Sequence, residues 1–242
     1  MGNEQQSALG RLILVAGMHR SGTSTATRVL SLLGARLPTN LLPPKKGENE
    51  TGFWESADLV NLNDSLLQSR GRSWDDIREI PDQEAPATWI AAARDWLHPQ
   101  LEANTALVLK DPRLGRLFPY WSELCGSLGV ETIVLFPYRD PTEVARSLCK
   151  RNDVSEAYAY WLWLRYIVEG ERSSRGSKRH FINYHELLRA PRDAAERLAG
   201  FASLPAPTPQ SIEAVQQFVE PTHRHHFESF NPSGKALGLP PL

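Results

Sequence analysis

The chain has little cysteine, almost no net charge and no long apolar run among its 242 residues. Two cysteines, Cys125 and Cys149, are too few for a disulfide framework and indicate reduced thiols in a cytoplasmic protein. A net charge of −1 provides no general field for nucleic acid, so we expect no nucleic-acid partner. His19 and Arg20 interrupt the first apolar run, so we expect no stable membrane insertion.

The composition itself is that of a folded globular protein. Hydrophobic residues make up 41% of the chain and charged residues 23%, which is enough to bury a sizeable core. The length suits one domain over residues 1–242. Within it, we expect residues 1–10 to be a flexible N-terminus and residues 221–242 to be a loop-like tail, because the tail ends in a Gly/Pro-rich stretch.

Short continuous apolar segments alternate with helical patterns along the chain. Continuous runs rich in Val, Ile and Leu are typical of strands that are covered on both faces. The predicted strands are Leu12–Ala16, Ala106–Leu109, Thr132–Phe136 and His180–Asn183. The predicted helices are Ser24–Leu33, Ser56–Gln68, Thr88–Glu102, Leu117–Leu128, Thr142–Arg151, Glu156–Arg172 and Ala194–Ala202, with Trp161–Leu164 packed in the core. This order predicts an α/β fold in which helices flank both faces of a parallel sheet.

The segment that follows the first strand has the features of a phosphate-binding loop. Gly17 and Gly22 have the spacing of the Walker A frame, and a helical pattern begins directly after them. A helix start attracts phosphate through its unpaired N–H groups and its dipole. Thr23 stands where Walker A needs lysine, and the basic residue is Arg20 inside the loop. The loop therefore suits a phosphate, but not the β- and γ-phosphates of ATP.

A second phosphate-binding pattern follows the third strand. Arg139 comes directly after the strand, and Ser147 lies eight residues later on the next helix. An arginine fork and a hydroxyl can hold one phosphate from two sides. The alternative is that Asp140 and Pro141 only begin a helix.

Four motifs occur in order, each at or just after a predicted strand end: GMHRSGTS, KDPR, YRDP-x5-S and NYHELL. Together they resemble the superfamily of sulfotransferases that use PAPS (3′-phosphoadenosine 5′-phosphosulfate), and most closely its bacterial and Golgi-type branches. The resemblance covers residues 12–188. It implies a P-loop NTPase-like sulfotransferase fold and transfer of a sulfuryl group from PAPS to a hydroxyl. The product would be PAP (3′-phosphoadenosine 5′-phosphate), and no metal is expected.

The resemblance also implies roles for particular residues. Those expected at the 5′-phosphate are Arg20, Ser21, Gly22, Thr23 and Ser24. Arg139 and Ser147 would bind the 3′-phosphate, and Tyr184 would lie near the adenine. Lys110 and Arg20 would stabilise the charge that develops on the leaving oxygen.

The resemblance to the Golgi-type branch implies that the general base is a glutamate between the phosphate loop and the strand of Lys110. Glu48, Glu50 and Glu55 are the candidates, and we prefer Glu55 because its aromatic neighbours would raise its pKa by desolvation. The alternative is that Glu55 and Ser56 only mark a helix start.

Two other functions remain open at this stage. One is a P-loop nucleotide kinase or NTPase, and the other is a non-catalytic protein that binds a phosphoadenosine nucleotide. The acceptor is a small molecule, a carbohydrate or another hydroxyl compound. The loops expected to select it, Pro38–Thr51 and Glu79–Pro86, contain no pattern that identifies it, and neither oligomeric state nor the role of the tail can be deduced.

Overall fold

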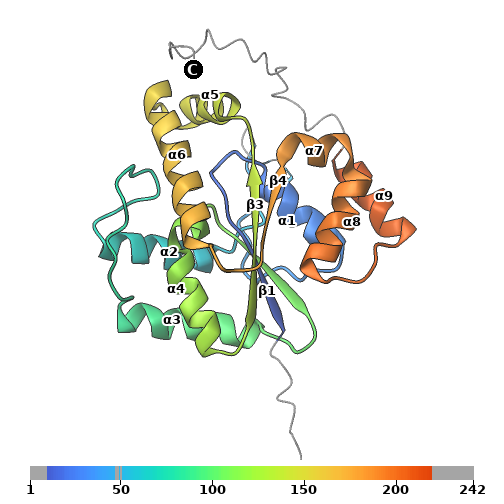
Figure 1. The fold of residues 1–242 in the computed structure, drawn as a ribbon, viewed down its shortest axis with the longest axis horizontal. Coiled ribbons are helices and arrows are strands. Elements are labelled where there is room, and N and C mark those ends of the chain that lie inside the picture. The colour runs from blue at the N-terminus through green and yellow to red at the C-terminus, as the bar shows by residue number, and fades with distance from the viewer. Residues whose placement is uncertain (1–9, 47–48, 50, 220–242) are drawn as a thin grey trace, which may run out of the picture.

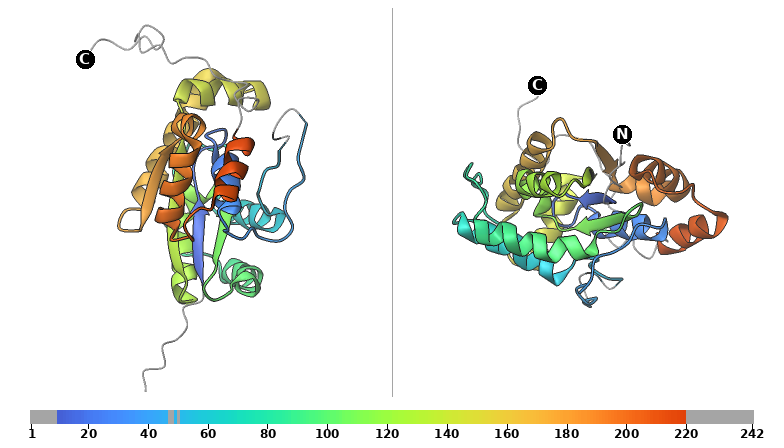
Figure 2. Two further views of the ribbon diagram at one scale, coloured as in Figure 1. Left: turned by 90° about the vertical axis from the view of Figure 1, so that its right-hand side faces the viewer. Right: turned by 90° about the horizontal axis from the view of Figure 1, so that it is seen from below.

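The computed structural model describes residues 10–46, 49 and 51–219 (Figures 1 and 2). In this part of the chain, parallel strands form one sheet in the order β2-β1-β3-β4. The strands are β1 (Arg11–Val15), β2 (Ala106–Lys110), β3 (Glu131–Tyr138) and β4 (Arg179–Asn183). Because all strands run the same way, their carboxyl ends meet at one edge of the sheet.

Helices cover both faces of this sheet (Figure 1). One face is covered by α1 (Thr23–Leu32), α7 (Tyr184–Arg189), α8 (Pro191–Ala202) and α9 (Pro209–Phe218). The other face is covered by α2 (Ala57–Ser69), α3 (Ala87–Leu97), α4 (Leu114–Ser127) and α6 (Glu156–Ser173). The helix α5 (Pro141–Asn152) crosses the top of Figure 1 and packs on α6.

The central strand β1 shows why the strand sequences are continuously apolar. Ile13 and Val15 belong to the core beneath α1, α8 and α9, whereas Leu12 and Leu14 belong to the core beneath α2, α3 and α4. All four side chains are fully buried. Full burial of such a side chain contributes about 1.5–3 kcal/mol, so no polar residue alternates with them.

The predicted α/β architecture is confirmed, and each predicted strand matches an observed strand to within two residues at either end. Several helical features differ from the prediction. The helices α4 and α8 begin three residues earlier than predicted, and α3 ends at Leu97 rather than Glu102, with a short 3₁₀ helix at His98–Gln100. The helices α7 and α9 were not predicted. Both missed helices have side-chain caps, Asn183 for α7 and Thr208 for α9. We expected a flexible N-terminus at residues 1–10 and a loop-like tail at residues 221–242. Apart from residue 10, these residues lie outside the described ranges.

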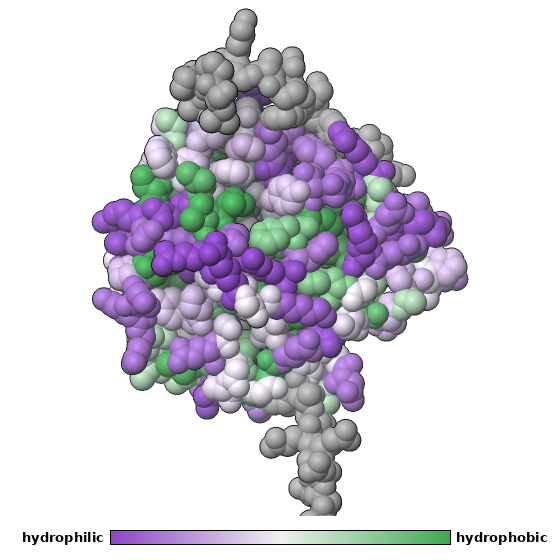
Figure 3. All heavy atoms as spheres, in the orientation of Figure 1, coloured by the Kyte–Doolittle hydropathy of each residue, from purple (hydrophilic) through white to green (hydrophobic). Residues whose placement is uncertain are grey.

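The expected core position of Trp161–Leu164 is wrong for part of the segment. Leu162 is buried, but Trp161 is 61% exposed, and Leu164 is exposed as well. The helix α6 packs on α4 and α5 along one side only, so its other side faces solvent and shows apolar side chains (Figure 3). None of the helices in the described ranges combines the length and the apolar character needed to cross a bilayer.

Candidate active site

The carboxyl ends of all four strands supply the residues that the sequence singled out. The loop 17–22 follows β1, Lys110 ends β2, Arg139 follows β3 and Tyr184 follows β4. The strand order puts β1 between β2 and β3, so the loop lies between Lys110 on one side and Arg139 on the other. In open α/β sheets, ligands bind at this edge, where the connections leave in opposite directions.

The loop 17–22 turns sharply into α1. Arg20 has a φ of 68° and Gly22, the N-cap of α1, a φ of 88°. A Cβ atom added to Gly22 would lie 2.2 Å from the ring of Tyr184, so only glycine fits there. Among the described residues no side chain caps α1, and its first turn contains no acidic residue. The free N–H groups and the positive end of the helix therefore face this loop.

Lys110 and Glu55 form a buried ion pair on the β2 side of the loop. Their side chains are 2% and 10% exposed, and the lysine donates a hydrogen bond to the carboxylate. Lys110 also donates to Ser24 Oγ at 3.1 Å and to the carbonyl oxygen of Phe53 at 3.2 Å. One ammonium group thus links the first turn of α1 to the segment that carries the glutamate.

Burial raises the pKa of Glu55, although the charge of Lys110 opposes the shift. A carboxylate in this environment is a stronger base than one in water. The alternative was that Glu55 and Ser56 mark a helix start, and α2 does begin at Ala57 with Ser56 as its N-cap. Glu48 and Glu50 lie outside the described residues.

Arg139 and Glu143 form a second buried ion pair on the β3 side. The guanidinium donates to the carboxylate, and both side chains are less than a tenth exposed. The other carboxylate oxygen of Glu143 lies 3.1 Å from Nε2 of His185. Asp140 accepts hydrogen bonds from the N–H groups of residues 142 and 143, so the predicted Asp-Pro helix start is correct as well.

Ser147 accepts a hydrogen bond from Nε of Arg20 at 2.8 Å. The structure thus joins Ser147 to the loop after β1 rather than directly to Arg139. Tyr184 packs on the other side of the loop, with the Arg139 guanidinium 5.0 Å from its ring centroid. The residues predicted for the two phosphates therefore lie in one continuous cluster.

His19 is a site residue to which the sequence assigned no definite role. Its ring makes edge contacts with Trp74 at 4.7 Å and with Tyr166 at 5.9 Å between centroids. Its Nε2 atom is buried and has no hydrogen-bond partner in the described structure. The same holds for the hydroxyl of Ser21, two residues further along the loop. Buried polar atoms are normally paired, so these two are exceptions among the described residues of the site.

The surroundings of His19 favour its neutral form. Burial is the main reason why the pKa of His19 lies well below its ordinary value. The cationic side chains that shift it further in the same direction are Arg151, Arg113, Lys110 and Arg20. An imidazole here is therefore uncharged at neutral pH.

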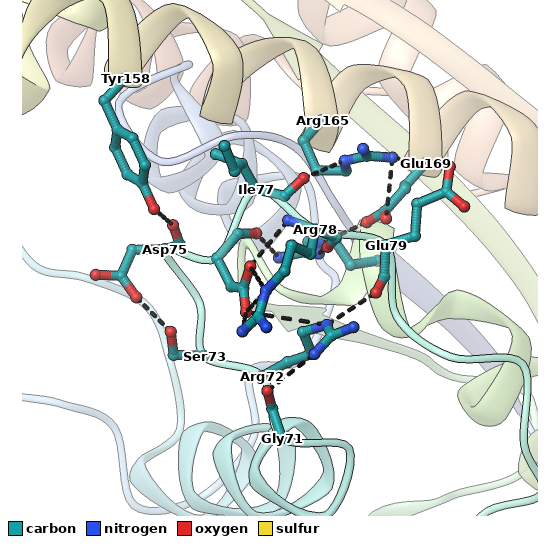
Figure 4. A network of polar contacts seen from close by, with 12 residues as sticks. Gly71, Arg72, Ser73, Asp75, Ile77, Arg78, Glu79, Tyr158, Arg165 and Glu169 are labelled. Carbon is teal, nitrogen blue, oxygen red and sulfur yellow. Dashed lines mark hydrogen bonds and ion pairs between the residues drawn. The ribbon is translucent and has the colours of Figure 1, made fainter.

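An irregular segment, residues 74–79, holds Trp74 against His19, and we call it the strap. All six of its backbone carbonyls accept a hydrogen bond from a side chain. The donors, in carbonyl order, are Tyr166, Tyr158, Arg116, Arg165, Arg116 and Arg72, at 2.6–2.8 Å. Figure 4 shows Tyr158 and Arg165 reaching from α6 to the strap. Because each of these carbonyls is paired, the backbone of the strap is held in place and forms a rigid wall beside His19.

Arg113 and Arg116 are buried rather than solvent-exposed. Arg113 pairs with Asp111 and Asp64 at 3.0 and 2.7 Å, and Arg116 pairs with Glu169 at 2.5 Å. They therefore hold α2, α4 and α6 around the site. In the described ranges, no group of three or more His, Cys, Asp and Glu side chains is arranged to hold a metal ion.

No family model matches the chain, and no curated protein does. Among solved structures, it is similar to the sulfotransferase domain of a Synechococcus olefin synthase, with 15% identity and a TM-score of 0.47 over 88% of this chain and 78% of that chain. It is also similar to the sulfotransferase domain from the curacin biosynthetic pathway, with 17% identity and a TM-score of 0.48 over 85% and 77%.

A mouse sulfotransferase solved with PAP is a third similar structure, at 10% identity and a TM-score of 0.45, covering 89% of this chain and 65% of that chain. The chain is thus similar in structure to sulfotransferases. At these identities the chemistry of its site has to be deduced from its own residues.

Proposed function

We propose that the protein is a sulfotransferase that moves a sulfuryl group from PAPS to an acceptor hydroxyl and releases PAP. The observation that carries the proposal is the arrangement across the carboxyl edge of the sheet. A helix N-terminus lies in the middle, the buried Lys110–Glu55 pair lies on the β2 side, and the buried Arg139 lies on the β3 side. This matches a donor with a reacting 5′-phosphosulfate at one end and a 3′-phosphate at the other.

The 5′-phosphate binds to the loop and the first turn of α1 in this proposal. The groups that receive it are the N–H and hydroxyl groups of Ser21, Gly22, Thr23 and Ser24, with Arg20 beside them. A single 5′-phosphate needs neither a Walker lysine nor Mg²⁺. The 3′-phosphate binds to Arg139 and Ser147, and Tyr184 lies near the adenine.

The reaction is an in-line displacement that resembles phosphoryl transfer. The acceptor oxygen forms a bond to sulfur while the bond between sulfur and the 5′-phosphate oxygen breaks, and the electron pair leaves with PAP. Lys110 and Arg20 stabilise the charge on that oxygen. Glu55 takes the proton of the acceptor hydroxyl, which its raised pKa favours. Lys110 must turn from Glu55 toward the leaving oxygen, so donor binding itself frees the base.

The acceptor is a small molecule, a carbohydrate or another hydroxyl compound that enters between Glu55 and the His19–Trp74 wall. Both cysteines are free thiols, which fits a cytoplasmic protein. The alternatives are a P-loop kinase or NTPase that uses MgATP, and a non-catalytic nucleotide-binding protein.

Thermal shift titrations with PAP, AMP and ATP plus Mg²⁺ test the donor. A ligand at a hundred times its Kd stabilises the folded state by about 2.7 kcal/mol, which raises the Tm of a chain of this size by about 5–11 °C. We expect such a shift with PAP, a smaller one with AMP and no effect of Mg²⁺. A shift with MgATP and none with PAP would replace the proposal by the kinase.

Two substitutions then separate donor binding from chemistry. Arg139→Ala removes a charged contact worth about 1.5–3 kcal/mol and should weaken PAP binding at least tenfold. Glu55→Gln should bind PAP normally and lose turnover of PAPS with the acceptor, whereas turnover that survives would favour the non-catalytic role for this glutamate. Arg192→Ala, at an exposed arginine of α8, is the control and should change neither quantity.

A further inference from the structure

An acidic residue stands in the middle of the proposed 3′-phosphate site. Arg139 stands two residues before α5, and Glu143 and Ser147 are four residues apart on one face of that helix. The carboxylate therefore lies in the chain between the arginine and the serine that are proposed to hold the phosphate.

Glu143 holds the arginine on which the 3′-phosphate is proposed to bind. One of its carboxylate oxygens accepts a hydrogen bond from Arg139 Nε, and the other faces His185 Nε2 at 3.1 Å. Glu143 is only 9% exposed and Arg139 only 7%, so water screens this pair weakly. The free protein thus already contains an anion at this arginine.

The start of α5 attracts both the Glu143 carboxylate and a 3′-phosphate, so these two anions compete for the same place. Glu143 lies in the first turn of the helix, where the dipole favours negative charge. A 3′-phosphate dianion that bonds to Arg139 needs the same charge and the same part of the helix. Two anions in one poorly screened site repel each other, so the carboxylate has to leave the arginine.

We propose that Glu143 is an internal anion that occupies the 3′-phosphate site and is displaced from Arg139 when the donor binds, while it keeps its contact with His185. The inference rests on the proposed PAPS donor and adds a residue that limits the affinity for that donor. A nucleotide with a 3′-hydroxyl leaves the carboxylate at Arg139, so only a ligand with a 3′-phosphate meets the cost of displacement. Glu143 therefore lowers the affinity of the site for every 3′-phosphorylated nucleotide, and His185 limits this cost because its contact with the carboxylate does not involve Arg139.

The test is isothermal titration of Glu143→Gln with PAP and with AMP at fixed ionic strength. The amide keeps the shape and still accepts a hydrogen bond from Arg139, but it has no charge. We expect PAP affinity to rise about tenfold, the effect of removing about 1.4 kcal/mol of repulsion, with AMP affinity unchanged. Glu143→Asp keeps the charge and is the matched control, in which the ratio of PAP to AMP affinity should stay near that of the parent protein.

A second variant tests the role of His185. His185→Phe keeps a ring and removes Nε2, so it should weaken PAP binding in the parent protein but not in the Glu143→Gln background. Thermal melting of each variant without ligand checks that it is folded.

The outcomes separate the two proposals. Weaker or unchanged PAP binding in Glu143→Gln, while the parent protein binds PAP, would overturn the displacement and make Glu143 a support for Arg139. No PAP binding by either protein would overturn the PAPS donor itself, and this inference with it.

Discussion

Replacing Lys110 by methionine should destabilise the protein strongly, because it leaves the Glu55 carboxylate buried without its counter-ion. Lys110 is 2% exposed, and the Glu55 side chain is 10% exposed. Removing one partner of a buried ion pair typically costs about 3–5 kcal/mol. For a chain of this length, each kcal/mol lowers the Tm by about 2–4 °C. Lys110→Met should therefore melt roughly 6–20 °C lower at neutral pH.

The stability that Lys110→Met loses should increase with pH. The charge and the hydrogen bond of Lys110 lower the pKa of Glu55, so removing them lets burial raise that pKa further. A carboxyl whose folded pKa is raised contributes stability at pH values below its ordinary pKa, and this stability is lost as the pH rises through the raised value. The deficit of Lys110→Met should thus be largest near pH 8 and smaller near pH 5.

Urea unfolding at the two pH values measures this effect, with Glu55→Gln/Lys110→Met as the matched control. The double variant has no buried charge at this position, so it should recover most of the loss. The reasoning is refuted if Lys110→Met loses less than about 1 kcal/mol, the range of an exposed ion pair. An equal deficit at pH 5 and pH 8 would refute the pKa argument alone.

Two further predictions concern the loop after β1. Gly22→Ala should abolish PAP binding and destabilise more than Gly176→Ala, since both glycines have a positive φ but only the Cβ at Gly22 meets the ring of Tyr184. The control, measured in the same melting experiment, should show only the backbone cost of about 1–2 kcal/mol. His19→Phe should flatten the loss of stability below about pH 6.5, because the unfolded chain takes up a proton there that the buried imidazole refuses. Urea unfolding between pH 7 and pH 5 checks this, and an unchanged slope would contradict the neutral His19.

The fold and the location of the site could be predicted because both depend on local patterns. A strand covered on both faces must be apolar at consecutive positions, as Leu12 and Ile13 show, and parallel strands bring their carboxyl ends to one edge. The glycine pair of the loop and the arginine after β3 then had to lie at that edge. Most of the predicted site residues therefore lie close together.

The contacts between these residues could not be predicted in the same way. The burial of His19 depends on Trp74 and Tyr166, which are distant in the sequence and have no pattern that links them to the loop. The pairing of Arg139 with Glu143 depends on the turn between β3 and α5, because Arg139 lies before the helix and outside its regular spacing.

The strap has a consequence for how its surface can change. The tyrosine and arginine side chains that anchor it bond to backbone carbonyls, and every amino acid has the same carbonyl whatever its side chain. The side chains of Asp76 and Glu79 also pair with the anchors Arg72 and Arg165, and Trp74 and Ile77 pack against the core. Only Asp75 and Arg78 can therefore be substituted without loss of such a contact. In the proposed sulfotransferase, these two positions are where the surface of the strap can change its chemistry while its backbone stays in place.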